Sequence, residues 1–241
     1  MGVLRTLYWL LALTLMAQLS GCLLNRVYAF KEQFCDYQSN FTFVVDDGVS
    51  MHMHHPVLRD TNVIWLLGAS PTFRTEGTET LEMVYVVEKD IGENAAEYAI
   101  PLHLEFQQKN GQMLLRAGII DKNLSAMITP GLIRETVAHA CTAQARMVSR
   151  SVHFDLHDLD PDDIPTPQEI VAALGPPNGE ATGGMLYRFR LRGAGPEVEK
   201  SFARIWLDST GKKVERVQFR YLIYQLDADF VSGEGSIRIF L

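Results

Sequence analysis

The sequence predicts an α+β protein in which antiparallel sheets dominate and a few short helices lie between the strands. Short runs of alternating apolar and polar residues recur along the 241-residue chain. Asp46-Asp47-Gly48 and Asn110-Gly111 lie between such runs and are typical of β-hairpin turns. Helical signals are confined to brief segments with a capping residue or proline at the start and glycine after the end.

The first half of the chain is predicted to form mostly strands. Residues 41–45 and 49–55 alternate around the first turn, and residues 81–88 are rich in β-forming side chains. Asp60 as a cap and Gly68 as a stop predict a short helix between them. In the hairpin 98–120, a two-residue turn at Asn110-Gly111 predicts these opposite pairs: Phe106 with Leu115, Leu104 with Ala117, Leu102 with Ile119 and, on the other face, Glu105 with Arg116.

The second half is predicted to hold two helices and further strands. Thr129-Pro130 opens the first helix, whose apolar stripe includes Cys141, and Thr166-Pro167 opens the second, which ends at Leu174. Strands are expected at 151–156, 185–192, 202–207, 214–226 and 236–241. The acidic, proline-rich run 158–167 predicts a linker between an N-terminal domain, 22–157, and a C-terminal one, 168–241, and thus two subdomains.

Residues 1–21 form a segment unlike the rest of the chain. One cation, Arg5, precedes the apolar run LYWLLALTLMA, residues 7–17. A helix of about eleven residues is roughly 17 Å long, too short for the roughly 30 Å hydrocarbon core of a membrane. A charged start, an apolar centre and small residues at the end predict a cleavable secretory signal peptide.

This signal ends in Leu19-Ser20-Gly21-Cys22. In sequence and position, these residues resemble the L-[AS]-[GA]-C lipobox of bacterial lipoprotein signal peptides. The resemblance implies diacylglyceryl transfer to the Cys22 thiol, cleavage before Cys22 and acylation of the new amino terminus. It also implies an outer-membrane protein that faces the periplasm, because Leu23 and not an aspartate retention signal follows Cys22. Two or three acyl chains suffice for stable anchoring.

Composition excludes two classes of partner. The chain carries 22 basic and 29 acidic side chains, a formal net charge of −7. Nucleic acids and anionic membrane surfaces attract basic proteins, so neither is expected to bind through charge. The expected membrane contact is therefore the N-terminal lipid.

Two further cysteines remain once Cys22 is assigned to lipid. In the oxidising periplasm, Cys35 and Cys141 are most simply interpreted as one disulfide. Such a bridge would contribute about 4 to 5 kcal/mol on the chain-entropy description.

The C-terminal part resembles a second family. Residues 166–191, TPQEIVAALGPPNGEATGGMLYRFRL, and 202–219, FARIWLDSTGKKVERVQF, are similar to the SmpA/OmlA small lipoproteins of the outer-membrane β-barrel assembly machinery. In that family a helix ending in LGxP precedes an antiparallel sheet and a strand-G-x-V-x-x-V hairpin. The resemblance implies that another envelope protein is the partner.

Histidines suggest a rival function, a periplasmic zinc- or copper-binding protein. On strands, His52 and His54 would share one face, and His153, Asp155 and His157 would share a face elsewhere. If the two strands were neighbours, these side chains could bind one metal ion. The alternative interpretation is that the histidines are solvated on the polar face of a sheet.

Arginines on a predicted strand suggest a docking surface. Arg188, Arg190 and Arg192 alternate with apolar residues, so they would share one face and could bind an acidic partner. The alternative is a polar outer surface on which these cations pair with Glu197, Glu199 and Glu215.

No nucleophile motif, phosphate loop or metalloprotease helix is present, so no catalytic residue and no cofactor is assigned. The sequence therefore predicts a lipid-anchored binding or assembly module of the cell envelope that is not an enzyme.

Replacing the lipobox cysteine tests the anchor. Cys22→Ser removes the thiol that accepts the diacylglyceryl group, so incorporation of labelled lipid and fractionation with membranes should both be lost. Ser20→Ala keeps the lipobox pattern and should behave as the natural chain does. Unchanged labelling of Cys22→Ser would contradict lipidation at this position.

Overall fold

The computed structural model describes residues 25–26, 28–46, 48–90, 98–122, 129, 131–133, 136–137, 144–146, 151–193, 201–221 and 224–239. Most of these residues belong to antiparallel sheet, with a few short helices, in agreement with the predicted sheet-dominated fold. The strands are β1 (Phe41–Asp46), β2 (Gly48–Met53), β3 (Phe73–Glu76), β4 (Thr80–Lys89), β5 (Ile100–Lys109), β6 (Gln112–Asp121), β7 (Gln144–Arg146), β8 (Ser151–Asp155), β9 (Gly179–Ala181), β10 (Gly184–Leu191), β11 (Ser201–Leu207), β12 (Val214–Tyr221), β13 (Tyr224–Asp229) and β14 (Glu234–Ile239).

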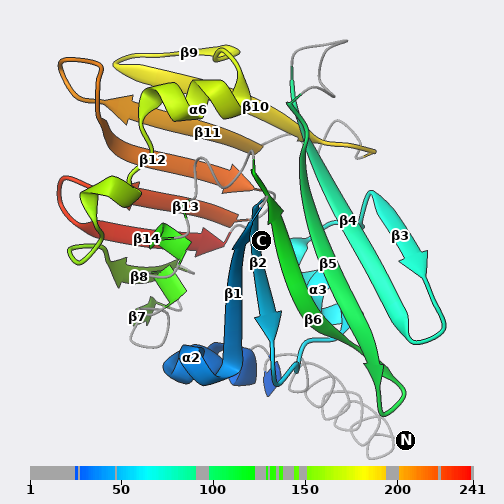
Figure 1. The fold of residues 1–241 in the computed structure, drawn as a ribbon. Helices are drawn as coiled ribbons and strands as arrows, with labels where there is room; N and C mark the ends of the chain where they lie inside the picture. Colours follow the sequence, from blue (N-terminus) through cyan, green and yellow to red (C-terminus); the bar gives the residue numbers. More distant parts are fainter. Residues whose placement is uncertain are drawn as a thin grey trace, which may run out of the picture.

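These strands form one 14-stranded sheet in the order β1-β2-β6-β5-β4-β10-β11-β12-β13-β14-β8-β7, with β3 added beside β4 and β9 beside β10. Figure 1 shows how strongly the sheet twists, since β1 to β6 and β9 to β14 run in clearly different directions. The predicted linker does not divide this sheet. β10 pairs with β4, and β14 pairs with β8, so strands from both sides of residues 158–167 are hydrogen-bonded to one another.

The helices are short. Residues 28–33 are helical and lead into η1 (Phe34–Asp36) and α2 (Tyr37–Asn40); the others are α3 (Asp60–Leu67), η3 (Pro161–Asp163) and α6 (Pro167–Leu174). The start of α6 is as predicted, because the Thr166 hydroxyl accepts from the Glu169 N–H and the Glu169 carboxylate accepts from the Thr166 N–H. The cap of α3 is Arg59, not Asp60 as predicted, since the Asn62 side chain accepts from the Arg59 N–H at 2.9 Å.

The register divides the sheet into two faces, which we call the inner and the outer face. One row across five strands of the inner face is Phe43, Met51, Gly118, Leu104 and Met83. The neighbouring row, on the outer face, is Thr42, His52, Ala117, Glu105 and Glu82. The inner row is apolar and the outer row mostly polar, as expected for a sheet with one buried face. The inner face therefore carries the core.

One hairpin departs from the predicted pairing. The turn is as expected, since Asn110 and Gly111 both have positive φ (52° and 71°), and Phe106 pairs with Leu115. A bulge between Glu105 and Phe106 then shifts the register, so Leu104 pairs with Gly118, Leu102 with Ile120 and Glu105 with Ala117. The predicted pairs Leu104 with Ala117, Leu102 with Ile119 and Glu105 with Arg116 are wrong. The extra residue places Gly118 and Ile120 on the inner face.

A buried lysine fixes α6 to the sheet. Lys89 is 1% exposed, and its ammonium donates to the Leu174 carbonyl at 2.7 Å and to the Pro176 carbonyl. A cation next to the carbonyls of a helix C-terminus is favourable, because those groups lack partners within the helix. The Lys89 ammonium also lies 4.6 Å from the centre of the Tyr98 ring and 5.3 Å from that of Tyr187.

The packing of α6 predicts a contrast between adjacent positions. Ile170 is fully buried in the core, whereas Val171 is 38% exposed. Ile170→Ala should lower the free energy of unfolding by about 2 to 5 kcal/mol because it leaves a cavity. Val171→Ala should change it by roughly 0.5 kcal/mol or less. Urea unfolding followed by tryptophan fluorescence measures both. Equal effects would contradict the placement of α6.

Candidate binding site

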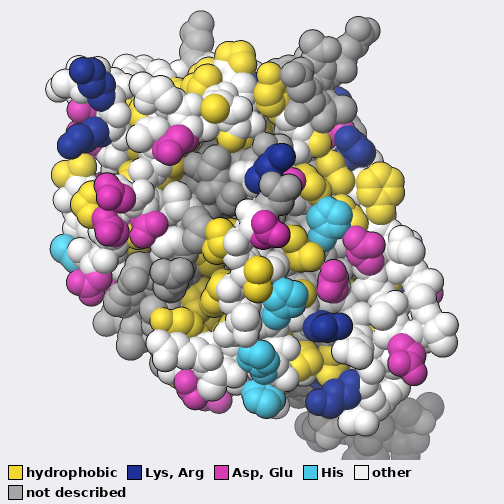
Figure 2. Space-filling model, in the orientation of Figure 1, with side chains coloured by type: hydrophobic (Ala, Val, Ile, Leu, Met, Phe, Trp, Pro, Cys, Tyr) yellow, Lys and Arg dark blue, Asp and Glu magenta, His cyan; other side chains and the backbone are white. Residues whose placement is uncertain are grey.

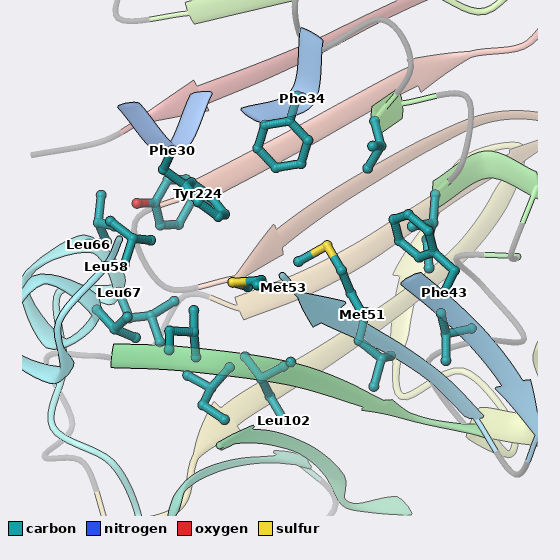
Figure 3. Close-up of a pocket in the computed structure, with 18 residues that line it drawn as sticks. Phe30, Phe34, Phe43, Met51, Met53, Leu58, Leu66, Leu67, Leu102 and Tyr224 are labelled. Carbon is teal, nitrogen blue, oxygen red and sulfur yellow. The ribbon is translucent and has the colours of Figure 1, made fainter. Parts of the chain in front are cut away.

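A cavity of about 410 Å³ lies against the inner face of the sheet. Figure 3 shows its lining: Phe30 and Phe34 approach from the N-terminal helical segment, Met51 and Met53 from β2, and Leu66 and Leu67 from α3. Every described side chain that lines it is apolar except Tyr224. A volume in this range, with an apolar lining, is typical of sites for small organic ligands.

A second cavity of about 350 Å³ adjoins the first. The two share the lining residues Leu102, Ile120, Ile133, Val137 and Tyr224, so they are two lobes of one site. The second lobe is lined by Ile100 of β5 and also by Phe219 of β12 and Leu226 of β13. β5 and β12 are separated by three strands in the sheet order, so the sheet must bend around this lobe to bring them to one space.

The N-terminal helical segment is held by both aromatic and polar contacts. The rings of Phe34 and Phe41 are stacked at 4.8 Å, and the ring of Phe30 meets that of Phe34 edge-on at 5.1 Å. The Gln33 amide donates to the His55 carbonyl at 2.5 Å, and Arg26 donates to the Val57 carbonyl at 2.8 Å. Because Phe30 and Phe34 are four residues apart on one side of a helical segment, both rings reach the first lobe.

The few polar groups of the site are hydroxyls. Tyr221 and Thr136 line the second lobe, and Tyr224 lines both. Burial raises the pKa of Tyr224 to about 12 and also raises the pKa of Tyr221. Among the described lining residues, none is charged. The site is thus suited to an apolar ligand and unsuited to a buried ionic group.

A third hollow of about 620 Å³ differs in chemistry. It lies between the η3 region and the turn before β12, and Asp162, Asp208, Lys212, Lys213 and Glu215 are among the residues that line it. Solvated charges of both signs are present, as at an ordinary polar surface. The two apolar lobes are therefore the stronger candidate site.

The predicted cysteine roles are only partly within the described residues. Cys35 is disulfide-bonded. Cys22, the predicted lipid site, and Cys141, the predicted disulfide partner, lie outside the described residues. Lipidation and the pairing of Cys35 with Cys141 stay predictions.

The structure does not bring the candidate metal-binding residues together. His52 is on β2, second from one end of the sheet order, and His54 directly follows that strand. His153 and Asp155 are on β8, second from the other end, with His157 just beyond it. Figure 2 shows histidines over the part of the sheet formed by β2 and its neighbours, and another at the opposite edge near β8. No three His, Cys, Asp or Glu side chains among the described residues are grouped to hold a metal ion.

Each of these histidines has a local partner instead. His52 is 3.2 Å from the Ser50 hydroxyl, His54 is 2.8 Å from that of Thr42, and His153 is 3.2 Å from that of Ser151. The Asp155 carboxylate accepts a hydrogen bond from His157 at 2.5 Å, which raises the pKa of that imidazole.

The predicted arginine surface is partly neutralised by a residue that sequence spacing does not reveal. Glu88 of β4, 7% exposed, lies 2.5 Å from Arg192 and 3.7 Å from Arg190. The N–H of Arg188 donates to the Asn178 side chain. The predicted partners Glu197 and Glu199 lie outside the described residues. Register across β4 and β10, and not proximity in sequence, makes Glu88 the partner.

The apolar site itself was not predicted from the sequence. Met51 and Met53 lie on β2, face inward and line the first lobe. Two features of the sequence accord with it once the structure is known: the spacing of Phe30 and Phe34, and Gly118 among large apolar residues on neighbouring strands. Neither predicts a cavity without the three-dimensional arrangement.

Comparison with known proteins adds no assignment. The chain matches no protein-family model, and neither a curated protein nor a solved structure is detectably similar to it. Among the described residues, no helix has the length and apolar character needed to cross a membrane.

The buried tyrosines predict how stability depends on alkaline pH. Burial raises the pKa of Tyr85, Tyr187 and Tyr224 to about 12, from 10.0. Between these values an unfolded chain releases phenolic protons that the folded chain retains, so the folded state loses stability as pH rises through this window. Urea unfolding and tyrosinate absorbance measure the effect. The pH dependence should be smaller in Tyr224→Phe, and an unchanged dependence would contradict burial of this phenol.

Proposed function

We propose that the protein is a lipid-anchored binding protein of the outer membrane that holds an apolar chain in the two-lobed site. The observation that carries the proposal is the lining: about 410 Å³ and about 350 Å³ of adjoining space bounded almost entirely by apolar side chains. Protein interiors are normally packed with few voids larger than a water molecule. Space of this size against an apolar face is accounted for by a ligand of the same chemistry.

The location in this proposal rests on the sequence. The lipobox at Cys22 implies a membrane anchor, and the N-terminal helical segment that lines the first lobe begins a few residues after it. An anchored protein with an apolar site is placed where membrane lipids are available as ligands. The proposed role is therefore capture or presentation of a lipid in the periplasm, and not a reaction.

Binding without catalysis fits the polar groups that are present. Two imidazoles among the described residues contact a carboxylate: His157 contacts Asp155 at an exposed position, and His103 contacts Glu82 where both side chains are partly exposed. None of them lines either lobe. Neither imidazole hydrogen-bonds to a hydroxyl or thiol in the described part of the chain. General-base activation of a nucleophile needs such a contact, and the imidazoles that do contact a hydroxyl, His52, His54 and His153, line neither lobe.

A cavity-filling substitution tests this function. Gly118 lines the first lobe, and a Cβ added there meets Leu104 at an ordinary 3.7 Å. Gly118→Leu should therefore fold and occupy the lobe. Binding of the hydrocarbon probe diphenylhexatriene, followed by its fluorescence, should weaken by about tenfold or more, equivalent to about 1.4 kcal/mol.

The matched control adds leucine to a strand outside the site. Thr75 on β3 is exposed and lines neither lobe, so Thr75→Leu should bind the probe as the natural chain does. Both variants are compared in the Cys22→Ser background, which carries no lipid of its own. Absence of probe binding in that background, or equal binding by Gly118→Leu, would reject the proposed function.

A further inference from the structure

The N-terminal helical segment forms one wall of the first lobe; we call its residues 28–40 the cover. The rings of Phe30 and Phe34 line the lobe, and Figure 3 shows them across it from Leu102 of β5. The opposite wall is made by β2, β6 and β5, each of which is hydrogen-bonded to a strand on both sides. Strands in such a wall cannot part without breaking a row of backbone hydrogen bonds. A ligand is therefore expected to enter past the cover.

The cover is only lightly attached to the rest of the fold. None of residues 28–40 is buried. The backbone leaves the helical conformation at Asp36 (φ −131°, ψ 61°), which divides the cover into two parts. The hydrogen bond from the Gln33 amide to the His55 carbonyl is exposed. Segments with few buried side chains and exposed hydrogen bonds open at a lower free energy than the rest of a fold, so the cover is the part of the site that can lift.

A disulfide fastens the cover. Cys35 lies within it and is disulfide-bonded. With Cys22 assigned to lipid, Cys141 is the predicted partner among the three cysteines of the chain. Cys141 lies outside the described residues, four positions after Val137, which lines both lobes. The predicted bond would therefore join two segments that line the site from outside the sheet.

Without the disulfide, the contacts that keep the cover in place are weak or replaceable. The ring of Phe34 stacks on that of Phe41, and the ring of Phe30 meets Phe41 edge-on at 6.2 Å. A hydrocarbon ligand offers these rings and the lobe surfaces of the same apolar chemistry, so little burial is lost when it passes between them. With the disulfide intact, the cover cannot lift without moving the segment to which Cys35 is bonded.

We infer that residues 28–40 gate the two-lobed site and that the disulfide of Cys35 holds this gate closed. The inference rests on the proposed function and adds its regulation. A dithiol reductant is the chemical class that opens the gate. Its two thiols are oxidised to a disulfide, while the protein disulfide accepts the electrons and protons and becomes two thiols.

The rates of probe exchange test the gate. Thiol titration of Cys22→Ser should find no free thiol before dithiothreitol is added and two afterwards, since two of the three cysteines remain. Reduction should then speed both association and dissociation of diphenylhexatriene by about tenfold or more in stopped-flow fluorescence. The dissociation constant should change by less than about threefold, because a gate alters the path to a site and not its lining.

A variant without the disulfide is the control for the reductant. The double variant Cys22→Ser, Cys35→Ser should exchange the probe as fast as the reduced protein, and dithiothreitol should have no further effect on it. Reduction is applied after folding, so the main test does not depend on whether this double variant folds.

Hydrogen exchange shows which part of the molecule opens. Reduction should speed amide exchange in residues 28–40 by about tenfold or more and leave β5 unchanged, because opening of the cover is local. Tyr187→Phe in the Cys22→Ser background is the matched control for general loosening. Tyr187 lines neither lobe, and its hydroxyl donates to the Gly175 carbonyl, so this variant should unfold at lower urea concentration without faster probe exchange.

The outcomes separate the gate from the function on which it rests. Unchanged probe exchange after reduction rejects the gate, as do two free thiols in Cys22→Ser before reduction. Equal acceleration in oxidised Tyr187→Phe rejects it in favour of general loosening. Failure of oxidised Cys22→Ser to bind the probe at equilibrium rejects the proposed function itself.

Discussion

The structure depends on a short joint between β4 and β10. Three residue pairs form it, Phe189 with Lys89, Arg190 with Glu88 and Leu191 with Val87. Glu88 receives two arginines on the outer face, and Lys89 reaches the end of α6 on the inner face. The Asp90 and Arg192 N–H groups continue the hydrogen bonding beyond the three pairs, to the carbonyls of Arg188 and Val86. The joint has few backbone hydrogen bonds, which alone would stabilise it weakly. Buried charged side chains that have partners on both faces of the sheet stabilise it further.

This joint makes the two-lobed site possible. With β4 and β10 paired, strands from the first and second halves of the chain form one inner face, and the bend of the sheet brings β5 opposite β12 and β13. Short helices cover parts of this face without filling it, so apolar side chains face one another across open space. Such space disfavours water and favours hydrocarbon, since an apolar lining offers water no hydrogen bonds.

The two faces also separate two kinds of chemistry. On the outer face, charged side chains pair with neighbours; Arg216, for example, makes two hydrogen bonds to Asp227 at 2.8 and 2.6 Å and lies over the Trp206 ring at 5.0 Å. On the inner face, the Tyr85 and Tyr187 hydroxyls donate to the backbone carbonyls of Ala69 and Gly175.

Local patterns in the sequence determined the hairpin turns, the start of α6 and the alternation that assigns residues to one face or the other, because these depend on neighbours within a few positions. The register beyond the β5–β6 bulge, the Glu88 ion pairs and the separation of the histidines depended on which strands are adjacent, and sequence spacing carries no such information. Of these features, the cavity is the one that the sequence predicts least. In a flat sheet these apolar side chains would fill a core. Here they enclose open space, because the bend of the sheet sets the distance between the two ends of its apolar inner face.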